Sequence, residues 1–194
     1  MIINGNKLLL AQPIVDMVPY KKSAEGTSYG LGEAGYDIRI KQDVTFFTKG
    51  SLGPQVKVDG KYQKGRFALA SAIEEFQMPR NMTGIVHDKS TWARKGLSVF
   101  NTVIEPGWNG FLTLELVYHG SEILHIKAGS GIAQVLFHQN AEYAQYTGKY
   151  QNQRDEPVAA LQATGTYCSV CNLAQFDSPG GVTCPNGHGG AEPL

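Results

Sequence analysis

Short apolar segments separated by glycine- and proline-containing turns recur along most of this chain, and they constrain its fold more than any other feature. The segments expected to form strands are 36–40, 44–47, 67–72, 84–87, 97–103, 111–119, 123–127 and 132–138. Such spacing is typical of an antiparallel barrel or sandwich. Long stretches with the 3.6-residue period of an amphipathic helix are missing, and residues 70–76 are expected to form one helical turn at most. The sequence therefore predicts an all-β protein.

Three regions fall outside this series of strands. Residues 21–35 are rich in glycine and polar residues and are expected to form a loop, and residues 48–65 are expected to form a turn-rich, lysine-bearing connection. Residues 141–163 turn polar and are expected to form an arm that closes over a site. The last residues differ again in composition, so we divide the chain into a main domain, residues 1–163, and a short tail, residues 164–194.

Composition excludes several classes of protein. The chain has 194 residues, of which 17 are basic and 17 acidic, and this neutrality argues against a protein that coats polymeric nucleic acid. The apolar runs are shorter than a membrane span, and the N-terminus lacks the regions of a signal peptide. Three cysteines, all near the C-terminus, do not make a disulfide framework. We expect a soluble, cytoplasmic protein without a membrane partner.

The densest group of chemically useful residues lies near the middle of the chain. Ser90 is expected to cap a short helix, residues 91–95, that ends at Gly96. The free backbone N–H groups at its start, together with Lys89 and Ser90, would form an anion site. Ser90 and Arg94 are four residues apart and share one helix face. The simpler explanation is a capped surface turn.

An acidic turn and a strand follow about ten residues later. Glu105-Pro-Gly-Trp-Asn-Gly predicts a tight turn, and residues 111–119 alternate between two faces of a strand. Leu112, Leu114 and Leu116 point one way, whereas Glu115 points the other way. A carboxylate in the middle of a strand is costly unless it has a partner or a role. The alternative is that Glu115 faces water.

Several segments resemble the dCTP deaminase family, in the dUTPase superfamily. KSTWARKGL followed by NTVIEPGWNGFLTLEL resembles the family signature, and further similar segments, in the family's order, are TSYGLGEAGYDIRI, FALASAIEEFQMPRNMTGIV, GSGIAQVLF and KYQNQ. The resemblance covers roughly residues 28–153. It implies a distorted β-barrel of jelly-roll type that works as a homotrimer or hexamer, with each site at a subunit boundary. It also implies hydrolysis of dCTP to dUTP and ammonia, with Mg²⁺ on the triphosphate and no catalytic zinc.

The resemblance also assigns roles to residues of this chain. It makes Ser90, Arg94 and Glu115 the catalytic set, and it gives a substrate-binding set of Lys89, Ser90, Thr91, Val103, Glu105, Gln134, Tyr143, Lys149 and Gln153. Tyr146 is an alternative to Tyr143 as the tyrosine of the closing arm. Glu105 and Gln134 also have simpler explanations, as a turn residue and a structural hydrogen-bonding residue.

The residue types in this set suit the chemistry. Deamination at C4 of cytosine needs an activated water, a proton on N3 and a proton on the departing ammonia. One shielded carboxylate can relay these protons if burial raises its pKa, and Glu115 suits that role. Arg94 and Ser90 would orient the water and stabilise charge as preorganised donors.

A dUTPase is the main alternative. Such enzymes resemble this stretch but normally carry an apolar residue where this chain has Glu115, and an aspartate and usually a tyrosine where it has Glu105 and Trp108. Three further alternatives stay open: an enzyme with both activities, a deaminase of dCMP or of a modified cytosine nucleotide, and a scaffold without catalysis.

The tail contains a set of zinc-type ligands. Cys168 and Cys171 form a C-x2-C pair, and Cys184 and His188 follow. A Cys3His set with this spacing predicts a structural zinc site; unrelated free thiols are the alternative. Zinc-dependent deaminases use H-x-E and P-C-x-x-C segments, which are absent here, so we do not expect a catalytic zinc.

Overall fold

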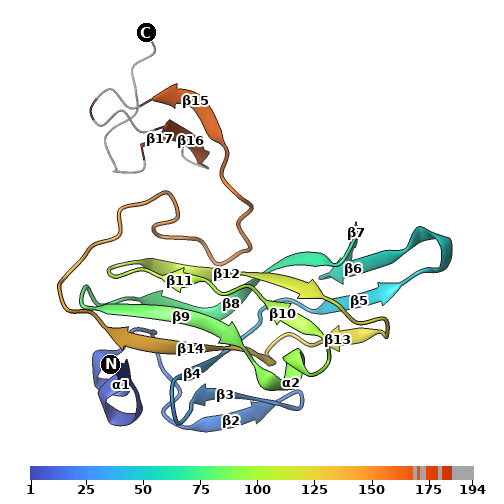
Figure 1. The fold of residues 1–194 in the computed structure, drawn as a ribbon, viewed down its shortest axis with the longest axis horizontal. Coiled ribbons are helices and arrows are strands. Elements are labelled where there is room, and N and C mark those ends of the chain that lie inside the picture. The colour runs from blue at the N-terminus through green and yellow to red at the C-terminus, as the bar shows by residue number, and fades with distance from the viewer. Residues whose placement is uncertain (168–169, 171–173, 179–180, 185–194) are drawn as a thin grey trace.

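The computed structural model describes residues 1–167, 170, 174–178 and 181–184. Most of its regular structure is β (Figure 1). The helical elements are short: α1 spans Gly5–Ala11, α2 spans Ser90–Ala93, and a 3-10 turn spans Gly50–Leu52. No helix in these ranges is long and apolar enough to cross a membrane.

The largest sheet has seven strands. Its order is β11-β9-β14-β4-β3-β2, and β1 also pairs with β14. The bounds are β1 Ile2–Ile3, β2 Lys21–Ala24, β3 Thr27–Leu31, β4 Tyr36–Arg39, β9 Met82–Asp88, β11 Val103–Ile104 and β14 Gly131–Gln139. Its strands pair antiparallel.

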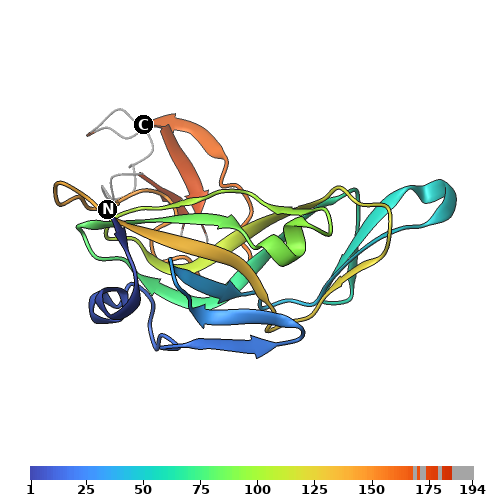
Figure 2. The ribbon, with the colours of Figure 1, turned by 60° about the horizontal axis from the view of Figure 1, so that its bottom comes forward.

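Two further sheets belong to the main domain. One has the order β10-β12-β8, with bounds β8 Phe67–Gln77, β10 Leu97–Val99 and β12 Asn109–Tyr118. The other has the order β13-β5-β6-β7, with bounds β5 Val44–Thr48, β6 Pro54–Val58, β7 Lys61–Lys64 and β13 Leu124–Ile126. The β5–β6 hairpin extends beyond the rest of the main domain (Figures 1 and 2).

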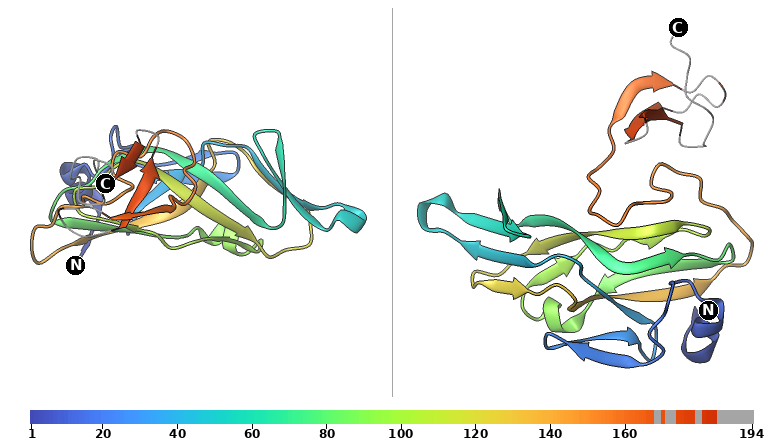
Figure 3. Two further views of the ribbon diagram at one scale, coloured as in Figure 1. Left: turned by 90° about the horizontal axis from the view of Figure 1, so that it is seen from above. Right: turned by 180° about the vertical axis from the view of Figure 1, so that it is seen from behind.

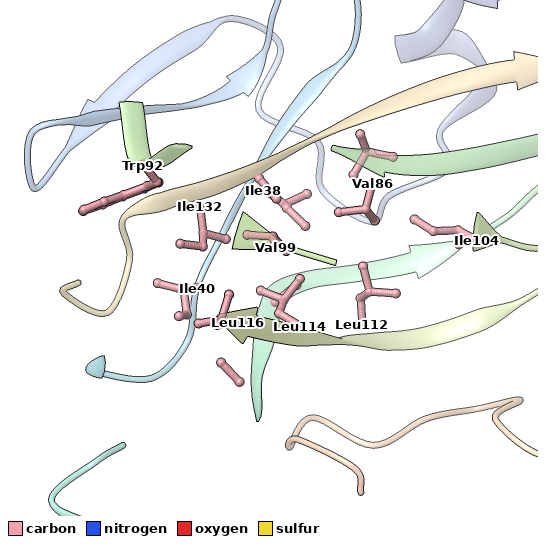
Figure 4. Close-up of a cluster of buried hydrophobic side chains, with 14 of the residues drawn as sticks. Ile38, Ile40, Val86, Trp92, Val99, Ile104, Leu112, Leu114, Leu116 and Ile132 are labelled. Atoms are coloured by element: carbon pink, nitrogen blue, oxygen red, sulfur yellow. The ribbon is translucent and has the colours of Figure 1, made fainter. Parts of the chain in front are cut away.

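The core lies between the seven-stranded sheet and the sheet of β8, β10 and β12. Leu112, Leu114 and Leu116 of β12 point into it and meet residues from the facing sheet, such as Ile38 and Val86 (Figure 4). Because alternate residues of a strand point to opposite faces, burying the leucines directs Thr113 and Glu115 to the other side of β12. This placement of Glu115 confirms the alternation expected from the sequence.

The tail contains a small sheet of its own. Its strands are β15 Ala163–Tyr167, β16 Ala174–Ser178 and β17 Gly181–Thr183, in that order and antiparallel. Because β15 and β17 both run opposite to β16, they end on the same side of this sheet. Of the expected zinc ligands, only Cys184 lies within the described residues, and it is buried. Cys168, Cys171 and His188 lie outside them.

Three expected elements differ from the structure. Residues 70–76 are part of strand β8, because β8 pairs with β12 along most of its length and thereby satisfies its backbone groups. Residues 21–35 contain the hairpin β2–β3 instead of a loop, and the connection expected over 48–65 contains the hairpin β6–β7. The described strands lie in four sheets and form no closed barrel by hydrogen bonding, whereas the expectation of a mostly β protein is confirmed.

Candidate active site

A cavity of about 460 Å³ lies beside β12, on the face that carries Glu115. Its wall comes from β8, from residues 102–105, from β12 and from the segment 146–160. Most of this lining is apolar or aromatic, and its polar side chains besides the tyrosines and Trp108 are Thr102, Glu105, Thr113, Glu115 and Gln153. Among the described residues that line it, two are carboxylates and none is lysine, arginine or histidine.

Glu115 is half-buried at this cavity. Burial raises the pKa of its carboxyl group above the ordinary glutamate value, and the hydroxyl of Thr102, 3.4 Å from Oε2, opposes part of that rise. Desolvation disfavours the charged carboxylate, and no cation of the cavity wall offsets this effect. With a raised pKa, this carboxyl group holds a proton more readily than an ordinary glutamate does, which suits a group that must accept and release protons.

The polar arm folds back over the acidic turn of the same chain. We call residues 146–161 the strap. The Trp108 indole N–H donates to the carbonyl of Tyr150 at 2.6 Å, and the Phe111 N–H donates to the carbonyl of Gln153 at 3.0 Å. The Gln153 side-chain amide also donates to Oγ1 of Thr113. These contacts place Gln153 against the strand that carries Glu115.

The second half of the strap returns to the same threonine. The N–H of Val158 donates to Oγ1 of Thr113 at 3.0 Å, so Thr113 accepts from both halves of the strap. Between them, Asp155 forms an ion pair with Lys41 on the main domain. The N–H of Leu161 donates to the Tyr150 hydroxyl at 3.3 Å. These bonds close the strap into a loop over the cavity.

The short helix α2 lies on the other side of the main domain from the strap (Figures 1 and 3). The Trp92 indole N–H donates to the carbonyl of Gly131 at 2.7 Å and fixes the helix against β14. Gly96 ends the turn with a φ of 86°, as expected from a glycine stop. Ser90 was expected to cap this helix, but Lys89 occupies the cap position, and no side chain caps it.

Lys89 and Gln134 belong to a buried polar cluster next to α2. Lys89 is 9% exposed and forms an ion pair with Asp37, which is 4% exposed. The Lys89 ammonium also donates to the Ser28 hydroxyl at 3.0 Å, and the Gln134 amide lies 3.4 Å from the other oxygen of Asp37. The ammonium of Lys89 is therefore engaged inside the protein, whereas Ser90, Thr91 and Arg94 are exposed.

The structure thus separates the predicted site residues into two groups. The cavity brings together Val103, Glu105, Glu115 and Gln153. It does not include Lys89, Ser90, Thr91, Arg94, Gln134 or Lys149, and the Lys149 ammonium donates to the carbonyl of Leu161 at 3.1 Å. Tyr146 lines the cavity, whereas Tyr143 is 79% exposed and does not.

Sequence reasoning missed three hydroxyl-bearing residues of the cavity wall, besides its apolar lining. Thr102 and Thr113 were not among the candidate residues, and neither was Tyr150. The alternation of the strand could have identified Thr113, because it lies two residues before Glu115 on the same face. Thr102 and Tyr150 carry no comparable local signal, since their positions depend on how the turn and the strap fold. In the described part of the chain, His, Cys, Asp and Glu form no group of three or more that could hold a metal ion.

Comparison with known proteins identifies the family. The family model described as dCTP deaminase-like matches residues 20–140. The chain belongs to the dCTP deaminase-like family. This result confirms the resemblance inferred from the sequence and the expectation of a deaminase-type enzyme.

Similar proteins cover most of the chain. It is 36% identical to a dCTP deaminase of Protochlamydia amoebophila in an alignment that covers 74% of this chain and 87% of that protein. It is 35% identical to a dCTP deaminase of Acidobacterium capsulatum in an alignment that covers 79% of this chain and 96% of that protein.

Among solved structures, a dUTPase of EIAV superposes with a TM-score of 0.44 at 18% identity, covering 70% of this chain and 89% of that one. A dUTPase of Staphylococcus bacteriophage 80alpha gives a TM-score of 0.45 at 14% identity and covers 67% and 88%. Similarity at this level supports no statement about the site.

Proposed function

We propose that this dCTP deaminase-like protein hydrolyses dCTP to dUTP and ammonia and that Glu115 carries the protons. The observation that supports this role best is the half-buried carboxyl group of Glu115, whose pKa is raised, on the wall of a cavity that the strap covers. The identity of 35–36% to proteins named dCTP deaminase supports the substrate.

The reaction balances with one carboxylate. Glu115 takes a proton from water as the water oxygen bonds to C4 of cytosine, and it passes this proton to N3. It then moves the remaining hydroxyl proton to the exocyclic nitrogen, and the C4–N bond breaks to release ammonia. Val103, Glu105 and Gln153 would hold the sugar and base, since these three residues line the same cavity. General acid–base catalysis of this kind contributes about 10²–10⁴-fold.

A triphosphate needs positive charge that the cavity wall of one chain does not supply. Ser90, Thr91 and Arg94 are exposed on α2 and lie outside the cavity. We therefore propose a homo-oligomer, a trimer or a hexamer of jelly-roll subunits, in which α2 of one copy completes the cavity of the next. Arg94 and Ser90 would there orient the attacking water and stabilise developing charge. Lys149 remains a proposed phosphate ligand that would leave Leu161 when nucleotide binds.

Magnesium fits this arrangement as a companion of the nucleotide. Mg²⁺ is usually bound through substrate phosphates, one or two carboxylates and water, and it needs no all-protein cage. When bound, it would neutralise part of the triphosphate charge. Of the two carboxylates among the described residues that line the cavity, Glu105 is the one that would contact it, because Glu115 carries the protons.

A dCTP-converting enzyme of this kind is also expected to work in the cytoplasm.

For the tail we propose a structural zinc bound by Cys168, Cys171, Cys184 and His188. The strand directions support this proposal, because Cys168 follows directly after β15 and Cys184 directly after β17, and both strands end on the same side of the sheet. A four-ligand site leaves no open position for water, so its contribution would be to folding. Metal analysis of the full chain and of Cys168→Ser tests this. We expect one zinc per chain in the first and loss of zinc with retained deamination in the second.

A product assay tests the reaction. Purified protein is incubated with dCTP and Mg²⁺ and separately with dUTP, and ammonia and pyrophosphate are followed. We expect ammonia from dCTP without pyrophosphate, and Glu115→Gln is expected to lower turnover at least about 100-fold while nucleotide still binds. Pyrophosphate from dUTP without ammonia from dCTP would instead identify a dUTPase.

A complementation assay tests the shared site. Glu115→Gln and Arg94→Ala are each expected to be inactive, whereas mixing and reassembling them would create sites with an intact Glu115 from one chain and an intact Arg94 from another. We expect activity to return in the mixture. Mixed oligomers that form and stay inactive would show that both residues must come from one chain.

A further inference from the structure

Thr102 places its side-chain hydroxyl beside the Glu115 carboxylate. It lies in the segment between β10 and β11 and lines the cavity. Its Oγ1 lies 3.4 Å from Oε2 of Glu115 and also 3.4 Å from the carbonyl oxygen of Phe100. The hydroxyl therefore lies at equal distances from two different acceptors.

A hydroxyl in this position can serve both protonation states of the carboxyl group. A threonine hydroxyl has one donor proton and two acceptor lone pairs. When Glu115 is ionised, the hydroxyl can donate to Oε2. When Glu115 is protonated, the carboxylic acid can donate to Oγ1, and the hydroxyl proton then turns to the Phe100 carbonyl. Neither state leaves the hydroxyl proton without an acceptor.

We propose that Thr102 is a positioning residue that keeps Glu115 in one orientation while the glutamate gains and loses a proton. This proposal rests on the proton-carrying role proposed for Glu115. A glutamate that turned away after each proton transfer would have to be reoriented before the next transfer, and the reaction needs several transfers in sequence. The Thr102 hydroxyl does not touch the substrate in this scheme.

The backbone around Thr102 is held independently of its side chain. The N–H of Val86 donates to the carbonyl of Thr102 at 3.0 Å, and the N–H of Phe100 donates to the carbonyl of Glu115 at 3.0 Å. Removing the hydroxyl therefore leaves the ties that fix this segment. Thr102→Val keeps the shape of the side chain and removes only its hydrogen bonding.

The test compares three Thr102 variants with a control. Thr102→Val removes the hydroxyl, Thr102→Ser retains it, and Thr102→Ala replaces valine if that variant does not fold. Thr83→Val is the matched control. Thr83 lies on β9, its Oγ1 donates to Asn140 Oδ1 at 2.9 Å, and it is not among the cavity residues. For each protein, kcat and KM for dCTP are measured as a function of pH.

We expect Thr102→Val to lower kcat about fivefold to tenfold, the size typical of one lost hydrogen bond, with KM changed less than about twofold. The acidic limb of the pH profile should move to higher pH, because the hydroxyl's bond to the ionised carboxylate is stronger than its bond to the protonated acid, and losing both raises the pKa of Glu115. Thr102→Ser should restore kcat and the position of the acidic limb, and Thr83→Val should change neither of them.

Other outcomes overturn the proposal. An unchanged pH profile in Thr102→Val or Thr102→Ala, or a loss of kcat that serine does not rescue, would give Thr102 a merely structural role. Measuring Glu115→Gln in parallel distinguishes a failure of the proposed function from a failure of the role proposed for Thr102. If that variant retains turnover, the proposed function fails; if it is inactive and Thr102→Val behaves as wild type, only the role of Thr102 fails.

Discussion

Two carboxylates on opposite sides of the main domain have contrasting surroundings. Asp37, near α2, contacts the ammonium of Lys89 and the hydroxyl of Ser28, and the amide of Gln134 lies at its other oxygen. Glu115, on β12, has the Thr102 hydroxyl beside it, and the described residues of the cavity wall include no cation. A buried carboxylate paired with a cation cannot lose that partner without destabilising the fold, whereas one that is desolvated and uncompensated is available for proton transfer.

The largest expected effect comes from breaking the Asp37 cluster. Asp37→Ala would leave the Lys89 ammonium buried without its carboxylate, and removing one partner of a buried pair costs about 3–5 kcal/mol. We expect the free energy of unfolding to fall by that amount in a denaturant titration. Lys127→Ala is the control, because Lys127 and Asp43 form an exposed pair at 3.9 Å, which should contribute almost nothing.

A double replacement sharpens this result. Asp37→Leu combined with Lys89→Met removes both charges, and replacing a whole buried pair by apolar residues is often nearly neutral. We expect the double variant to be clearly more stable than Asp37→Ala alone. If the two proteins were equally destabilised, the Asp37–Lys89 pair would not be what distinguishes this side of the molecule from the Glu115 side.

On the side of Glu115, the strap depends on a close approach at Gly110. Gly110 has a φ of 130°, and a Cβ atom there would lie 2.5 Å from the backbone N of Gln153. Gly110→Ala should push the strap away from β12 and remove the contact of Gln153 with Thr113. We expect KM for dCTP to rise roughly tenfold, as lost contacts worth about 1–2 kcal/mol would give, and proteolysis between residues 146 and 161 to accelerate.

Gly129→Ala is the matched control for this prediction. Gly129 also has a positive φ, 84°, but a Cβ atom there would have no neighbour within 4 Å. It should therefore show the backbone strain of the substitution without any displacement of the strap. Equal changes in KM for the two variants would mean that strain alone, and not the close approach at Gln153, explains the result.

The sequence predicted the elements whose signals are local. The alternation of residues 111–119 placed the leucines in the core and Glu115 on the other face, and Gly96 marked the end of α2. It missed the β2–β3 and β6–β7 hairpins, because in each hairpin one strand, β2 or β7, is polar and mostly exposed and thus lacks the apolar pattern of a strand. Strand β8 was cut short because its later residues gain their pairing from β12, far along the chain.

The candidate site was predictable in its residues but not in its grouping. The resemblance supplied both Glu115 and Lys89, yet a motif does not tell which side of a sheet its parts face. Burial of Lys89 depends on Asp37, which lies 52 residues earlier in the chain. Thr102 and Tyr150 joined the cavity through the turn and the strap, whose tertiary contacts leave no periodic signal.

A smaller effect is expected at the outer tie of the strap. The Lys41–Asp155 pair is largely exposed, and such pairs contribute about 0.2–1 kcal/mol. Lys41→Gln should therefore raise KM for dCTP no more than about fivefold, with kcat unchanged, and the difference from wild type should shrink in high salt. Lys127→Gln provides the control, and an equal change in both variants would assign the effect to general charge.

The smallest expected effect is the contribution of the Glu115 carboxyl group to the free energy of unfolding, followed as a function of pH. Because burial raises its pKa in the folded protein, the proton binds more tightly there than in the unfolded chain. The resulting stability is fully present below the ordinary glutamate pKa and is lost as pH rises through the raised folded value. The free energy of unfolding of wild type relative to Glu115→Gln should therefore decrease with rising pH and then level off.

Glu33→Gln gives the opposite sign and serves as the control for this pH dependence. The hydrogen bond and ion pair with Lys21 lower the pKa of Glu33, so its contribution is present above the ordinary glutamate pKa and is lost as pH falls. Denaturant titrations of the three proteins across the acidic and neutral range would show the two slopes. If Glu115→Gln followed the slope of Glu33→Gln, the Glu115 carboxylate would have an unseen positive partner, and its contrast with Asp37 would disappear.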